Sequence, residues 1–129
     1  MPKTIQWNEE FEQEILNEKT GSIQIAIRPG RLYFDTQYFK KGDIVDIRVQ
    51  NKVIRKAMIQ NEPKLIQINE LTHSEYNVLK SSINTKEKLK YFLEKNYKTE
   101  LDDTSEITVI TYNNMNLVYL KENVDPHFC

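Results

Sequence analysis

The chain has 129 residues, of which 39% are hydrophobic and 29% charged. This length and composition predict a single globular domain with one hydrophobic core and exclude wholesale disorder. No apolar stretch approaches the roughly 18 residues of a membrane span, and the N-terminal residues lack the apolar centre of a secretory signal, so we expect a cytoplasmic protein without membrane contact. The single cysteine, Cys129, excludes an internal disulfide and a thiolate cluster, and we expect no metal and no cofactor.

Charge is unevenly distributed along the chain, although the formal net charge is only −1. Residues 28–56 hold eight basic side chains against three acidic ones, a balance of +5, whereas residues 99–129 hold one basic side chain against six acidic ones. Because a phosphate group responds to the local potential, residues 28–56 could bind nucleic acid while the whole chain stays mildly acidic. The alternative interpretation is that these cations only solvate the outer faces of strands.

The first expected element is a helix over residues 8–18, because Asn8 is a favourable N-cap and acidic residues follow it in the first turns. Apolar and polar residues then alternate over residues 22–28, which is the period of a half-buried strand. Further extended segments are expected at 31–34, 43–49, 52–60 and 64–69, with turns at 29–30 and 50–51.

Two helices are expected in the second half of the chain. Thr72 and Glu75 have the spacing of a capping box, and a helix over residues 85–95 places Leu89, Phe92 and Leu93 on one face. A strand over 106–112, a turn at 113–114 and a last strand over 116–120 follow. This order does not alternate strand and helix, so we expect an α+β fold: a small, mostly antiparallel β-barrel flanked by helices, with residues 1–129 as one domain.

The glycines are too far apart for a phosphate-binding loop or a nucleophile elbow, so nucleotide-loop enzymes and hydrolases of that class are excluded. Aromatic and basic residues are interleaved after residue 28, and bases stack on aromatic rings while phosphates pair with cations. Aromatic residues on a strand also build cores, which is the alternative. The candidate nucleic-acid-binding residues are Arg28, Arg31, Tyr33, Tyr38, Lys40, Lys41 and Lys52.

Several segments occur in an order that resembles a known family. Residues 11–20 precede Ile27-Arg28, and Phe39-Lys-Lys-Gly42-Asp43 then leads into a strand. Ile68-Asn-Glu-Leu-Thr72 and residues 103–111 follow. Over residues 8–112 this succession resembles the ASCH domain, a member of the PUA-like superfamily of small β-barrels associated with RNA. The resemblance implies an RNA- or nucleotide-binding module without catalysis.

Some ASCH proteins are amidohydrolases of acylated cytidine that use a Lys, a Thr and a Glu. Lys19 and Thr20 are similar to the Lys-Thr pair of that family, and Glu75 is the candidate for the Glu. The spacing from Thr20 to Arg28 is longer than the family's. The resemblance therefore leaves an alternative open, a small amidohydrolase of a modified nucleoside such as N4-acetylcytidine, with Lys19 activating Thr20 or water and Glu75 transferring the proton.

Overall fold

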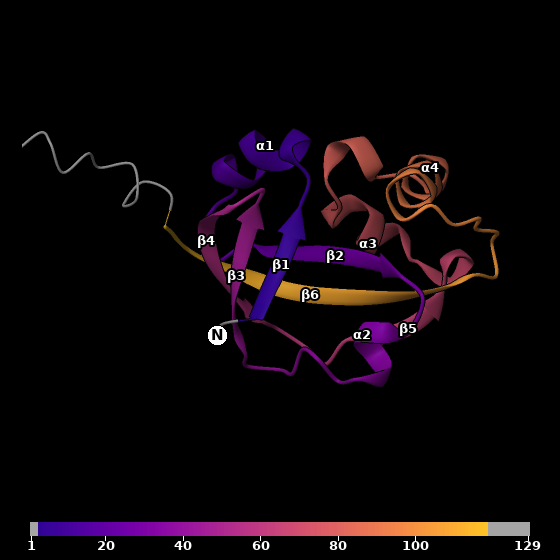
Figure 1. The fold of residues 1–129 in the computed structure, drawn as a ribbon, viewed down its shortest axis with the longest axis horizontal. Helices are drawn as coiled ribbons and strands as arrows, with labels where there is room; N and C mark the ends of the chain where they lie inside the picture. Colours follow the sequence, from indigo (N-terminus) through magenta and orange to yellow (C-terminus); the bar gives the residue numbers. More distant parts are fainter. Residues whose placement is uncertain (1–2, 119–129) are drawn as a thin grey trace, which may run out of the picture.

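The computed structural model describes residues 3–118, which form one sheet of six strands with helices packed against it (Figure 1). The sheet is bent into a half-barrel, and every strand pair is antiparallel except β1 with β3. The α+β, mostly antiparallel fold expected from the sequence is thereby confirmed. The strands are β1 (Lys3–Trp7), β2 (Ile23–Pro29), β3 (Ile44–Val49), β4 (Lys52–Ile59), β5 (Lys64–Gln67) and β6 (Glu106–Leu117). The α-helices are α1 (Glu12–Asn17), α2 (Leu32–Asp35), α3 (His73–Val78) and α4 (Lys86–Tyr97).

The long strand β6 organises the sheet. One edge of β6 pairs with β2, and its other edge pairs first with β5 and then with β4. The strand order β1-β3-β4-β6-β2 therefore ends at β1 on one side and at β2 on the other. In Figure 1 β1 passes in front of β2, and a hydrogen bond from Arg28 of β2 to the Gln6 carbonyl of β1 shows that the two end strands approach each other across the open side of the half-barrel. This opening is where the candidate site lies.

Helix α4 covers part of the sheet with the apolar face that the sequence predicts. Leu89 and Leu93 are fully buried, and the half-buried ring of Phe92 packs edge-on against Phe11 with 5.4 Å between the ring centroids. The helix begins after Thr85, whose hydroxyl accepts a hydrogen bond from the Lys88 backbone N–H. Such capping and burial explain why these residues form a stable helix.

The structure differs from the expected elements in three places. Strand β1 was not expected, yet Ile5 and Trp7 are buried while Gln6 points outward, which is the alternation of a half-buried strand. Residues 32–35 form α2 rather than an extended segment, and Thr36 Oγ1 donates to the Leu32 carbonyl at its end.

The third difference concerns residues 113–114, which continue β6 rather than turn. The backbone of Asn114 exchanges hydrogen bonds with the segment before β2, because its carbonyl accepts from Gly21 and its N–H donates to Ser22. These bonds extend the ladder between β6 and β2. The expected strand at 116–120 lies partly outside the described residues, and Cys129 lies wholly outside them.

Candidate functional site

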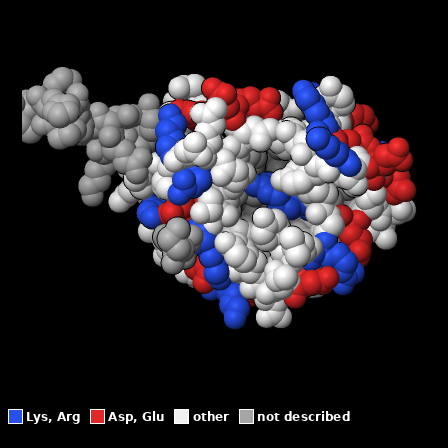
Figure 2. All heavy atoms as spheres, in the orientation of Figure 1, with Lys and Arg blue, Asp and Glu red and all other residues white. Residues whose placement is uncertain are grey.

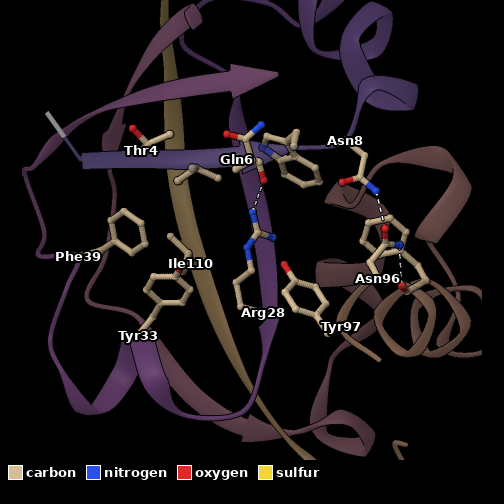
Figure 3. A pocket seen from close by; sticks show the side chains of 12 residues that line it. Thr4, Gln6, Asn8, Arg28, Tyr33, Phe39, Asn96, Tyr97 and Ile110 are labelled. Atoms are coloured by element: carbon tan, nitrogen blue, oxygen red, sulfur yellow. Dashed lines mark hydrogen bonds between the residues drawn. The ribbon is translucent and has the colours of Figure 1, made fainter. Parts of the chain in front are cut away.

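A cavity of about 260 Å³ opens between the end strands β1 and β2, with α4 on one side and the segment around α2 on the other (Figure 3). Figure 2 shows the corresponding hollow in the middle of this face, with blue atoms at its floor. The cavity has an aromatic lining made by Trp7, Tyr33, Phe39, Phe92 and Tyr97. Its polar lining is made by Thr4, Gln6, Asn8, Arg28 and Asn96. A concave site that combines aromatic rings with a few polar groups is typical of a small-ligand site.

Arg28 is the charged residue of this lining. Its Nη2 donates to the Gln6 carbonyl at 2.6 Å, and its Nη1 donates to the Ile27 carbonyl at 2.9 Å. The guanidinium carbon lies 5.5 Å from the centroid of the Trp7 ring. Arg28 is only 9% exposed, and it forms no ion pair with any carboxylate among residues 3–118. The cavity floor therefore carries a positive charge that two neutral carbonyls and a ring compensate only in part.

Two tyrosines lie on either side of Arg28 (Figure 3). Tyr33 is half-buried, and Tyr97, at the end of α4, is 44% exposed. On the α4 side, Asn8 Nδ2 donates to Asn96 Oδ1 at 2.8 Å, and Asn96 Nδ2 donates to the Phe92 carbonyl at 2.8 Å. Aromatic faces and amide groups thus surround the cation, an arrangement that suits a planar ligand with hydrogen-bonding edges.

A buried ion pair supports the cavity wall behind Trp7. Lys80 Nζ lies 2.8 Å from a Glu18 carboxylate oxygen and 4.4 Å from the Trp7 ring centroid, and it also donates to Gln24 Oε1. Burial lowers the pKa of Lys80, and the charge of Glu18 opposes this shift. Trp7 therefore contacts one cation that lines the cavity, Arg28, and another that is buried behind it.

Arg55 links the same region to β6. It is fully buried and donates to the carbonyls of Ile15, Glu18 and Met115, and its Nη2 lies 3.3 Å from Thr20 Oγ1. Burial lowers the pKa of Arg55, while the nearby Glu18 carboxylate raises it. Arg55 thus belongs to the basic segment in sequence and to the core in space.

The structure separates the candidate nucleic-acid-binding residues. Arg28 and Tyr33 line the cavity. Arg31 pairs with Asp35 and Glu106, and Lys52 pairs with Glu12.

The other three candidates precede β3. Lys40 and Lys41 are exposed in the loop before this strand, whereas Lys52 follows it, so these cations lie at opposite ends of β3. Tyr38 is 39% exposed, packs edge-on against Phe39, and has Lys3 Nζ 5.5 Å from its ring centroid.

Lys19, Thr20 and Glu75, the residues of the alternative reading, do not line the cavity. Lys19 and Thr20 are exposed between α1 and β2. Glu75 accepts hydrogen bonds from the Thr72 backbone and hydroxyl and forms an ion pair with Lys64 at 2.7 Å. The capping box expected at Thr72 and Glu75 is confirmed.

Of the residues that line the cavity, the sequence interpretation named only Arg28 and Tyr33 as binding residues and missed the rest. Trp7 and Asn8 lie on or just after β1, which the sequence did not predict, and Asn96 and Tyr97 are at the end of α4. The alternation of polar and apolar residues from Thr4 to Trp7 was a usable signal for β1. Nothing in the sequence indicates that the end of α4 faces this strand.

Two further features bear on the class of site. Residues 3–118 contain no group of three or more His, Cys, Asp or Glu side chains placed to hold a metal ion. Within the same residues, no helix has the length and apolar character needed to span a membrane.

Comparisons with known proteins support the fold. No protein-family model matches this chain, and no curated protein matches it. Among solved structures, it is similar to a crystal structure of a protein from Enterococcus faecalis that is described with the family model DUF984, with a TM-score of 0.67 and 14% sequence identity. The match covers 98% of this chain and 84% of that chain. At this level of identity the similarity shows a shared fold.

Proposed function

We propose that this chain is a non-catalytic PUA-like module of the ASCH type that binds a nucleotide unit, free or within RNA, in the cavity between β1 and β2. The observation that carries the proposal is Arg28, a buried cation without a carboxylate partner among the described residues, at the floor of an aromatic cavity. Buried charges are ordinarily paired, so an anionic ligand is the natural partner of such a group.

A phosphate suits Arg28 because a guanidinium presents five N–H donors, and two carbonyls engage Nη1 and Nη2 once each. Charge-assisted hydrogen bonds from the remaining N–H groups would bind phosphate oxygens. The two carbonyl contacts hold the guanidinium in place before a ligand arrives, which lowers the entropic cost of binding.

A nucleobase suits the walls of the same cavity. Tyr33 and Tyr97 offer ring faces on either side of Arg28, and stacking on such rings tolerates any base. The amides of Asn8 and Asn96 offer donors and acceptors to a base edge. A volume of about 260 Å³ limits the buried part of the ligand to one base or one sugar-phosphate unit.

We do not extend the proposal to hydrolysis, since no hydrogen bond or ion pair joins the side chains of Lys19, Thr20 and Glu75 within residues 3–118, and none of the three lines the cavity. We expect no efficient release of acetate from N4-acetylcytidine by the purified protein. Steady release that is abolished in Lys19→Ala would establish the amidohydrolase alternative instead.

The proposal is tested by titrating isotope-labelled protein with the four ribonucleoside 5′-monophosphates and following the backbone amide resonances. We expect the largest shifts in β1, around Arg28 and Tyr33, and at Asn96 and Tyr97. Shifts confined to other surfaces, or no shifts at low salt, would contradict a nucleotide site in this cavity.

A further inference from the structure

A second cavity adjoins the first one on the α4 side. It has a volume of about 230 Å³, and it shares Asn8, Phe92 and Asn96 with the cavity that holds Arg28. The Asn8–Asn96 hydrogen bond and the Phe92 ring therefore form the boundary between the two. A ligand that leaves the first cavity on the α4 side passes directly over this boundary.

The far wall of the second cavity is a stripe of α4. Lys88, Tyr91 and Lys95 line it, and their spacing of three and four residues places them on one helix face. Tyr91 is 67% exposed although it is a large aromatic residue. The two lysines are exposed and form no ion pair with a residue in the range 3–118. An exposed ring with an unpaired cation on each side is suited to a stacked base and its flanking phosphates.

The charged side chains of the second cavity attract an anion more strongly than those of a groove on the opposite side of the first cavity. The lining of the second cavity contains two lysines, Lys88 and Lys95, and one acidic residue, Glu10. The groove on the opposite side of the first cavity, reached past Tyr33 and Phe39, has one lysine and two acidic residues, Asp35 and Glu62. Figure 2 shows blue side chains over α4 at the edge of the central hollow. A polyanion leaving the first cavity is therefore attracted toward α4.

We infer that the ligand is a single-stranded oligonucleotide rather than a free mononucleotide, and that its second nucleotide binds the α4 stripe, with a base on Tyr91 and phosphates at Lys88 and Lys95. This inference rests on the proposed function of the first cavity. It adds a direction, because the strand crosses the Asn8–Asn96 boundary toward α4 rather than running past Tyr33 toward Lys40 and Lys41.

The experiment compares the dinucleotides pApA, pCpC, pGpG and pUpU with the corresponding monophosphates, using the fluorescence of Trp7, the single tryptophan of the chain. For the best-bound base we expect the dinucleotide to bind at least about fivefold tighter, since one stacked base contributes that much or more. We also expect a steeper loss of affinity with salt, because each added phosphate contact adds to the salt slope.

Three variants locate the second nucleotide. Tyr91→Ala should remove the gain of the dinucleotide and leave monophosphate binding unchanged. The double variant Lys88→Gln/Lys95→Gln should reduce dinucleotide affinity and salt dependence. The double variant Lys40→Gln/Lys41→Gln removes the same charge from the loop beside the groove on the opposite side, which Lys40 lines, and serves as the matched control, with little effect expected. All five positions are exposed, so the variants should fold.

The outcomes separate this inference from the proposed function. If monophosphates bind through Arg28 but dinucleotides bind no tighter, the inference is wrong and the proposed function stands. If the gain is lost in Lys40→Gln/Lys41→Gln and kept in Lys88→Gln/Lys95→Gln, the strand runs along the basic segment 28–56 and the inference is again wrong. If no nucleotide binds in an Arg28-dependent manner, both fail.

Discussion

Arg28 bridges to Gln6 across the open side of the half-barrel: its Nη2 donates to the Gln6 carbonyl at 2.6 Å, joining the two strands at the ends of the sheet order. The contact replaces, at one point, the ladder that a closed barrel would have between β1 and β2. The group proposed to bind phosphate is therefore also part of the framework. Substitutions of Arg28 must accordingly be judged on stability as well as on binding.

Tyr97 provides a test of base stacking. Tyr97→Leu should weaken the binding of the best ribonucleoside monophosphate by about 1–3 kcal/mol, the value of one stacked base. Tyr97→Phe keeps the ring and should retain most of the affinity. Isothermal titration calorimetry measures the binding free energy of both variants. Equal losses of binding free energy in the two would assign the contribution of Tyr97 to its hydroxyl rather than to stacking.

The Lys80–Glu18 pair provides a test of the cavity wall. Glu18→Gln leaves the buried Lys80 ammonium without its counter-charge and should cost about 3–5 kcal/mol of unfolding free energy. The double variant Glu18→Gln/Lys80→Met should be markedly more stable than Glu18→Gln alone, because it also removes the Lys80 ammonium that Glu18→Gln leaves unpaired. Denaturant unfolding followed by Trp7 fluorescence measures both. A double variant that is no more stable than Glu18→Gln would mean that the Lys80 ammonium does not depend on the Glu18 carboxylate.

Glu75 provides a test of pH dependence. Burial raises its pKa, but the hydrogen bonds from Lys64 and Thr72 outweigh burial and hold the pKa below its ordinary value. A lowered carboxylate pKa stabilises the folded state at neutral pH, and this stabilisation is lost as the pH falls through the folded-state pKa. Glu75→Gln keeps the capping acceptor, so it should cost up to about 1 kcal/mol at neutral pH.

The loss in Glu75→Gln should vanish in acid, where the wild-type carboxyl is protonated as well. Urea unfolding at neutral and acidic pH measures the difference. A loss that is independent of pH would show that the carboxylate charge contributes nothing, and a loss of nucleotide binding would place Glu75 in the site after all.

Helix α4 provides a test of packing. Leu93 is fully buried, so Leu93→Ala should cost about 2–5 kcal/mol of unfolding free energy. Phe92 keeps part of its ring at the cavity, so Phe92→Ala should cost less than the roughly 3–5 kcal/mol of a fully buried phenylalanine. Thermal and denaturant unfolding of the two variants checks this order. A Leu93→Ala variant that melts like the parent would mean that α4 does not pack on the sheet.

The fold was more predictable from the sequence than the site. Alternation over residues 22–28 and 43–49 located β2 and β3, although both strands also bury residues of the other face, such as Ala26 and Asp46. The spacing of Leu89, Phe92 and Leu93 reflects burial on one face of α4, which a local pattern reports directly. The helix α2 was missed because a single turn held by Thr36 and its neighbours has no periodic signal.

The site depends on contacts between distant parts of the chain. Charge counting grouped Arg28 with Arg55, but the structure places one at the cavity and the other in the core, bonded to carbonyls of α1 and β6. Tyr97 joins Arg28 only because α4 packs beside the end of β1. Sequence distance of this kind is bridged by tertiary packing, which composition and periodicity do not encode.

The most direct test of the central claim measures the contribution of the phosphate to binding, with and without Arg28. We compare a ribonucleoside with its 5′-monophosphate in the wild-type protein, in Arg28→Lys and in Arg28→Gln, after circular dichroism has shown that each variant is folded. The wild type should bind the monophosphate at least about tenfold tighter than the nucleoside, since hydrogen bonds between charged groups contribute about 1.5–3 kcal/mol. Arg28→Gln should bind the two equally, and Arg28→Lys should fall between. The same preference for the monophosphate in wild type and in Arg28→Gln would contradict the account, because the phosphate would then bind somewhere other than at Arg28.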